Sequence, residues 1–111
     1  MANIDTTAVV PLSSNYAVPR EATKEDITRL IDGYSHAAEY LQLAGFDGVE
    51  LHGAHGYLIA QFLSERTNHR TDEYGGSVKN RLRFVLEVAE AIRRRTKPGF
   101  ILGIKINSVG K

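Results

Sequence analysis

The sequence predicts an α/β protein with a parallel sheet, and it predicts that this chain holds only part of that sheet. Two segments with the apolar spacing of amphipathic helices alternate with two short apolar segments typical of buried strands. A two-stranded parallel sheet leaves both edges unpaired and encloses little apolar surface. Since an eight-stranded βα barrel typically needs about 250 residues, we expect these 111 residues to be part of a larger fold.

The composition is that of an ordinary globular protein and excludes several classes of function. The 14 basic and 13 acidic residues give a net charge of +1, so no basic field indicates nucleic acid or an anionic membrane as a partner. The absence of cysteine excludes disulfides, cysteine nucleophiles and cysteine-ligated metals, and it is compatible with a cytoplasmic location. No segment resembles a signal peptide or reaches the roughly 20 apolar residues of a membrane span.

The N-terminal part predicts a leader followed by a helix. Residues 1–22 contain two prolines and many polar residues without a sustained period, and we interpret them as an irregular leader. Thr23 and Asp26 have the spacing of a capping box, in which each residue satisfies a free backbone amide of the first helical turn. Apolar residues then recur on one face over residues 27–44, and Gly45 is suited to end the helix in a left-handed conformation.

A short strand and a long loop are expected next. Residues 46–51 form a largely apolar segment that predicts a strand, whereas residues 53–77 exceed the usual length of a connection and are expected to be functional or disordered. Arg70, Asp72 and Arg81 could brace this loop as an ion-pair lattice. One apolar group in the loop predicts a turn or two of helix: Tyr57, Leu58, Ile59, Phe62 and Leu63.

The C-terminal part predicts a second helix and a second strand. Ser77 is a candidate N-cap, and the helix is expected to end before Pro98. Residues 100–106 form an apolar segment rich in β-formers, which predicts a strand. Lys105 lies near the carboxyl end of this strand, and we expect that end to be buried. The apolar stripe of the helix is expected to comprise Val78, Leu82, Val85, Ala89 and Ile92, widened by Phe84 and Val88.

Three proton-handling side chains lie within six residues at the end of the first strand. His52, His55 and Tyr57 follow the apolar segment, and parallel α/β folds bind ligands at the carboxyl ends of their strands. Without further information, a hydrogen-bonded structural pair is the default interpretation of the histidines, because a metal site needs a third ligand that is not evident. Tyr57 alone would more often be a packing residue.

Three motifs follow one another closely along the middle of the chain. They are Gly45-Phe-Asp-Gly-Val-Glu-Leu-His52-Gly-Ala-His55-Gly-Tyr57-Leu58, then Gln61-Phe-Leu-Ser64, then Asn68-His-Arg70-Thr-Asp72-Glu-Tyr74-Gly-Gly-Ser77 with Asn80-Arg81. By these motifs the sequence resembles the old yellow enzyme family of FMN-dependent NAD(P)H:ene oxidoreductases, from about Pro19 to Val109. The resemblance implies a partial (β/α)8 TIM barrel over residues 23–111, with strands 4 and 5 and their flanking helices.

The resemblance also implies roles for four residues. His52 and His55 would hydrogen-bond the carbonyl or nitro oxygen of an activated alkene, and Tyr57 would protonate its α-carbon as general acid. These roles suit the side chains, because a neutral imidazole donates from one ring nitrogen and a phenol keeps its proton at neutral pH. Lys105 would contact FMN where the family commonly has arginine, keeping the charge without the planar fork. No metal is implied.

The function predicted in this way is FMN-dependent reduction of activated alkenes, with NAD(P)H as the reductant. The substrates would be small enones, with nitro compounds as a further class. The strands and late loops that supply the family's other flavin contacts have no counterpart here, so the chain alone is expected to bind FMN weakly or not at all. The alternative is a truncated, non-catalytic chain that acts through association with another chain at its exposed sheet edges.

Overall fold

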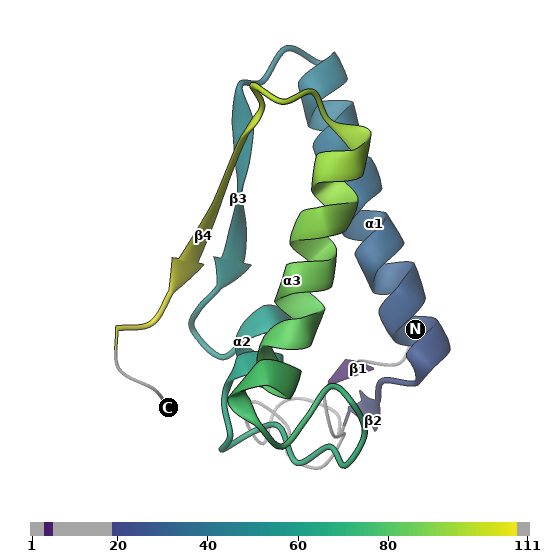
Figure 1. Cartoon of the computed structure of the whole chain (residues 1–111), viewed down its shortest axis with the longest axis vertical. Coiled ribbons are helices and arrows are strands. Elements are labelled where there is room, and N and C mark those ends of the chain that lie inside the picture. The colour runs from purple at the N-terminus through teal and green to yellow at the C-terminus, as the bar shows by residue number, and fades with distance from the viewer. Residues whose placement is uncertain (1–3, 6–18, 109–111) are drawn as a thin grey trace.

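The computed structural model describes residues 4–5 and 19–108 of the chain. Parallel strands β3 and β4 lie side by side, with the long helices α1 and α3 packed against one face (Figure 1). This arrangement confirms the predicted alternation of helices and strands in an α/β fold. The elements in chain order are β1 (Ile4–Asp5), β2 (Arg20–Glu21), α1 (Lys24–Leu43), β3 (Gly48–Gly53), α2 (Leu58–Leu63), α3 (Val78–Arg95) and β4 (Ile101–Ile106).

Helix α1 begins and ends as the sequence predicts. Thr23 Oγ1 accepts a hydrogen bond from the amide of Asp26 at 3.1 Å, and Asp26 Oδ2 accepts one from the amide of Thr23 at 2.8 Å. This reciprocal pair is the expected capping box. At the other end Gly45 has φ +98°, a left-handed conformation that costs glycine little, so the chain can turn back toward β3.

Strand β3 begins at Gly48, two residues later than predicted. Pairing with β4 starts where the Ile101 amide donates to the Asp47 carbonyl at 2.9 Å, and Phe46 stays exposed in the turn after α1. At Gly48 the two backbones approach so closely that a Cβ atom would overlap Ile101. The apolar Phe46 therefore belongs to the connection, and the strand extends to Gly53 instead of ending at Leu51.

The register of the sheet determines which side chains share a face. The parallel pairs run from Gly48 beside Ile101 to Gly53 beside Ile106, so His52 lies beside Lys105. Neighbours in a parallel pair point to the same side, and successive residues alternate between the two faces. Leu51 is buried and faces the helices. His52 and Lys105 must therefore project from the opposite face.

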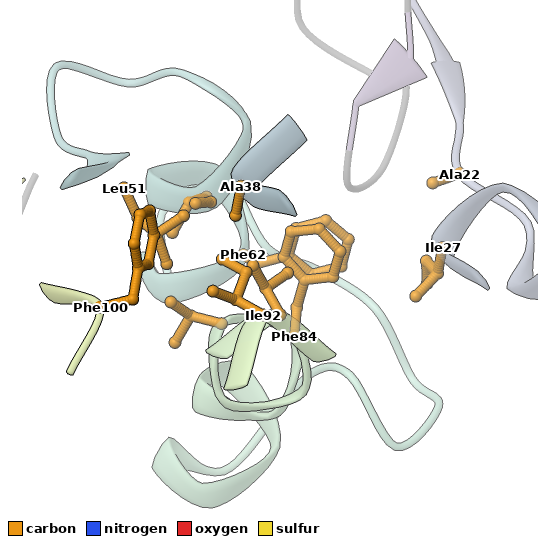
Figure 2. Packing of buried hydrophobic residues seen from close by; sticks show 11 residues of the cluster. Ala22, Ile27, Ala38, Leu51, Phe62, Phe84, Ile92 and Phe100 are labelled. Carbon is orange, nitrogen blue, oxygen red and sulfur yellow. The ribbon is translucent and has the colours of Figure 1, made fainter. Parts of the chain in front are cut away.

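The core lies between the sheet and the two long helices, with α2 closing one end. Phe62 from α2 stacks on Phe84 from α3 with ring centroids 4.4 Å apart, and Phe100 lies beside Leu51 at the sheet (Figure 2). The buried face of α3 is centred on Phe84, Val88 and Ile92, which are all buried.

The predicted apolar stripe of α3 is wrong at its N-terminal end, because Val78 and Leu82 are exposed. Helix α1 packs against α3, where the Tyr34 ring meets Phe84 edge-on, and Phe84 and Val88 belong to the buried core while the first turns of the stripe lie outside it.

The described part of the predicted leader contains a short stretch of paired backbone. Ile4–Asp5 and Arg20–Glu21 form a two-residue parallel pair, and residues 6–18 lie outside the described residues. Just after this pair, the carbonyl of Ala22 accepts a hydrogen bond from Arg70 Nη1 at 2.7 Å. The end of the leader is thereby attached to the long loop.

The long loop is braced by polar contacts of two arginines. Arg70 donates to both carboxylate oxygens of Asp72, at 3.0 and 2.7 Å, which confirms this part of the predicted lattice. Arg81 instead braces the loop through backbone carbonyls, those of Leu63 at 3.0 Å and Gly76 at 2.8 Å.

Among the described residues, no helix has the length and apolar character to cross a bilayer.

Candidate active site at the carboxyl end of the sheet

The candidate site is built where β3 turns into α2. After Gly53 the chain passes through buried Ala54, and His55 and Gly56 then both adopt left-handed conformations, with φ +61° and +75°. Glycine adopts this conformation freely, whereas for histidine it is uncommon. The two residues reverse the chain, so Tyr57 becomes the N-cap of α2 beside the end of the strand.

This turn brings the three predicted site residues together. The His52 ring lies in the middle, with its centroid 5.2 Å from that of His55 and 5.3 Å from that of Tyr57. All three side chains are exposed, and Tyr57 has 53% of its surface accessible. A ligand could therefore reach the two imidazoles and the phenol at the same time.

Lys105 joins this group through the sheet register. It lies beside His52 on the neighbouring strand, on the face opposite the helices. The sequence-based expectation that Lys105 sits at a buried strand end is wrong, because the side chain is exposed. The reason is that the described residues leave this side of the sheet uncovered. Glu50 and His52 on the same face are exposed too.

Two further residues contact the turn, and sequence reasoning assigned neither of them a role. Asn107, just after β4, accepts a hydrogen bond on Oδ1 from the amide of His55 at 3.3 Å. Gln61 in α2 is buried, and its Nε2 donates to the Gly56 carbonyl at 3.0 Å. A signal for Gln61 exists in the sequence, because it is the one polar residue in the apolar segment Leu58–Leu63. Asn107 has no comparable signal.

The arrangement suits acid and electrostatic chemistry on a small polar ligand. Two imidazoles can donate hydrogen bonds to one acceptor, a phenol can give up a proton, and an ammonium group adds positive charge on the same face. Nowhere in residues 4–5 and 19–108 do three His, Asp or Glu side chains gather as a set of metal ligands.

Known proteins match this chain in sequence along most of its length. The sequence profile of the NADH:flavin oxidoreductase / NADH oxidase family matches residues 1–108. The NADH-dependent flavin oxidoreductase nadA of Aspergillus parasiticus is 58% identical over 98 residues, which are 88% of this chain and 22% of that protein. The 12-oxophytodienoate reductase 2 of Arabidopsis thaliana is 45% identical over 94 residues, covering 85% of this chain and 25% of that protein.

Solved structures give the same result. An old yellow enzyme homologue from Zymomonas mobilis superposes with a TM-score of 0.85 at 36% identity, covering 96% of this chain and 32% of its own. A 2-naphthoyl-CoA reductase in complex with 2-naphthoyl-CoA gives a TM-score of 0.87 at 38% identity, covering 93% and 16%.

These matches confirm both the predicted resemblance and the partial (β/α)8 TIM barrel. The chain spans about a quarter of the length of the curated relatives it matches. With the family profile matched over nearly the whole sequence, the chain belongs to the NADH:flavin oxidoreductase / NADH oxidase family, to which the old yellow enzymes are related.

Proposed function

We propose that this chain carries the substrate-polarising and proton-donating part of an FMN-dependent NAD(P)H oxidoreductase that reduces activated alkenes. The substrates would be small enones and nitroalkenes. The observation that carries the proposal is the convergence of the His52, His55 and Tyr57 rings at the carboxyl end of β3. Its support from relatives includes a reductase named for 12-oxophytodienoate, which is a cyclic enone.

The two histidines would hold the activating oxygen of the substrate. Their ring centroids are 5.2 Å apart, so one acceptor oxygen can lie within about 3 Å of a donor nitrogen on each ring. Two converging donors stabilise negative charge as it develops on that oxygen. Electron density is thereby withdrawn from the alkene, and its β-carbon becomes the electrophilic position.

Tyr57 would supply the proton that completes the reduction. Its ring lies 5.3 Å from that of His52, so the hydroxyl can approach a substrate whose oxygen is held by the imidazoles. A phenol retains its proton at neutral pH and can deliver it to a carbanion-like α-carbon. Because Tyr57 sits at the N-cap of α2 and not on the strand, it approaches the substrate from a different direction than His52.

The residues present fit one edge of a flavin ring. Lys105 is exposed, cationic and beside His52 on the same face of the sheet, so it suits the electron-rich N1/O2 edge of the isoalloxazine. The chemistry that a bound FMN supplies is hydride transfer, from NAD(P)H to the β-carbon of the alkene. The family's other flavin contacts would come from barrel strands beyond the quarter of the fold that this chain spans.

A cytoplasmic location would agree with the absence of cysteine.

A chimera tests the proposed roles in a complete barrel. The matching segment of the Arabidopsis 12-oxophytodienoate reductase 2 is replaced by this sequence, and the two half-reactions are followed by stopped-flow absorbance of the flavin. Tyr57→Phe should slow flavin reoxidation by 12-oxophytodienoate by about 100-fold or more, since the proton donor is lost. Flavin reduction by NADPH should be nearly unchanged, because no proton from Tyr57 takes part in that step.

Tyr40→Phe is the matched control, because Tyr40 is an exposed tyrosine on α1 and not in the turn that carries the site. It should leave both half-reactions unchanged. Equal slowing of both half-reactions by Tyr57→Phe would contradict the proton-donor role. A chimera that purifies without flavin would contradict the proposed flavin contact.

A second candidate function is association with another chain, and one observation favours it. An apolar groove of about 1150 Å³ lies between α3 and the helix-facing side of β4. Its walls include Leu82, Leu86 and Ala89 from α3 and Leu102 and Ile104 from β4. An exposed apolar surface of this kind usually marks an interaction site. A chain that cannot complete the barrel alone could bind a partner there.

A further inference from the structure

We infer that Gln61 and Asn107 are positioning residues that hold the left-handed His55–Gly56 turn and thereby fix His55 and Tyr57 beside His52. The inference rests on the proposed function only in assigning chemistry to the three rings. The geometry itself is independent of that assignment. Two side chains from different elements bind the two residues of one turn, Asn107 at the His55 amide and Gln61 at the Gly56 carbonyl.

The turn needs support because its own backbone holds it weakly. Its closing hydrogen bond, from the Tyr57 amide to the Ala54 carbonyl, is 3.5 Å long, beyond the usual range for such bonds. His55 also adopts a left-handed conformation, with φ +61°, that a residue with a Cβ atom avoids unless its surroundings enforce it. Without the two braces, His55 should relax toward an ordinary extended or helical conformation.

Relaxation of the turn would disperse the site. Tyr57 follows Gly56 directly, so a change at His55 and Gly56 redirects the chain that carries the phenol. His52, in contrast, is held by the pairing of β3 with β4. The distance of the His55 and Tyr57 rings from the His52 ring is therefore set by the turn and not by the sheet.

Gln61 acts from inside the structure. Its side chain is buried in α2, and because only the amide nitrogen can donate to the Gly56 carbonyl, Nε2 must face the turn. Its Oε1 is buried and has no hydrogen-bond partner among the described residues, which is unfavourable for stability. Replacing Gln61 by methionine removes a useful donor and an unpaired acceptor together. This substitution should release the turn at little cost to global stability.

Asn107 acts from the end of the sheet. It follows β4 two residues after Lys105, and its bond to the His55 amide joins segments 52 positions apart in sequence. The loop that carries the histidine is thus tied to the strand that carries the cation. Asn107 is exposed, so substitutions there should not disturb the core.

Proton NMR of the full 111-residue chain, without cofactor or substrate, tests the inference. In the unaltered chain the His52 ring protons should show nuclear Overhauser contacts to the rings of Tyr57 and His55. Gln61→Met and Asn107→Leu should each lose most of this intensity. Asn107→Asp keeps the acceptor oxygen and should retain it.

Gln42→Met is the matched control, because Gln42 also bonds a backbone group, the Lys97 amide at 2.7 Å, but does so from α1. It should leave the ring contacts unchanged. Ring contacts that persist in both Gln61→Met and Asn107→Leu would overturn the inference. If Gln61→Met fails to fold, the comparison of Asn107→Leu with Asn107→Asp decides. If the ring contacts are present in the unaltered chain and are lost in the variants, but the chimera does not reduce alkenes, the proposed function is contradicted and the inference about the turn is not.

Discussion

Asp26 shows how a buried charge can organise the start of this fold. The residue has 2% exposure, and its carboxylate accepts hydrogen bonds from Arg20, from Arg29 and from the Thr23 amide. The Arg20 guanidinium is the main cause that holds the pKa of Asp26 far below its usual range, and the Thr23 amide adds to it, while burial opposes both. Asp26 thus caps α1 and also attaches the chain segment that precedes the helix.

The lowered pKa predicts acid-sensitive stability. A carboxyl group with a depressed folded-state pKa stabilises the fold fully above its unfolded value, about 4, and the contribution is lost as the pH falls below that value. Asp26→Asn should lower the melting temperature at pH 7 and should reduce its further decrease between pH 6 and pH 3. Circular dichroism melts across this range measure both effects.

A residual acid dependence should remain in that variant, because Arg70 lowers the pKa of Asp72 in the same direction. An unchanged pH slope in Asp26→Asn would show that the ion pairs at Asp26 do not stabilise the folded chain.

For individual residues, the sequence was most informative where the groups that act together are close in the chain. His52, His55 and Tyr57 are close in sequence and close in space, so their grouping could be predicted. The exposure of Lys105 could not, since it depends on what covers the opposite face of the sheet. The contact of Asn107 could not be predicted either, because Asn107 lies 52 positions from His55 in the sequence.

Among the elements, helix α1 was the most predictable because its signals lie in the chain next to it. Thr23, Asp26 and Gly45 provide the start and the end of the helix without help from tertiary contacts. Strand β3 was less predictable at its ends. Its first residue depends on where β4 begins to pair, and this is decided by a strand 53 positions further along the chain.

Removing a cap should measure this local contribution. Thr23→Ala eliminates the side-chain acceptor of the capping box and should lower the free energy of unfolding by about 1 kcal/mol. Urea denaturation followed by circular dichroism gives this value. Thr28→Ala is the matched control, because Thr28 bonds the Lys24 carbonyl within the helix, where alanine has the higher helix propensity.

The control should therefore be neutral or slightly stabilising. Equal losses in Thr23→Ala and Thr28→Ala would indicate that the hydroxyl contributes generally along α1 and not as a cap.

The whole molecule is an incomplete layer structure, and its exposed surfaces follow from that. One side of the sheet is covered by α1 and α3 (Figure 1). Glu50, His52 and Lys105 are exposed on the other side. That the sheet would be partial could be predicted from the number of strands. The position of the apolar groove could not, because it depends on how α3 packs against α1 and β4.

The groove predicts that the chain binds apolar probes and associates with other chains. Leu86 lines it with 58% of its surface exposed, so Leu86→Gln should reduce the fluorescence of bound ANS and lower the sedimentation coefficient of any associated species. Leu43→Gln provides the comparison, because Leu43 is also highly exposed but lies at the end of α1, outside the groove.

The same decrease in ANS fluorescence and sedimentation coefficient in both variants would mean that any exposed leucine contributes to probe binding and association, whether or not it lines the groove. No decrease in either would remove the groove as a docking surface.

The pairing of His52 with Lys105 also has a consequence for comparing sequences. Since side chains alternate along β4, deleting one residue anywhere between Ile101 and Ile104 would bring Ile106 beside His52 and turn the lysine toward the helices. A hydrocarbon would then occupy the place of the cation, although every residue of β3 stayed the same. In an alignment of relatives, the number of residues between Ile101 and position 105 therefore carries as much information about the charge beside the histidine as the residue at that position does.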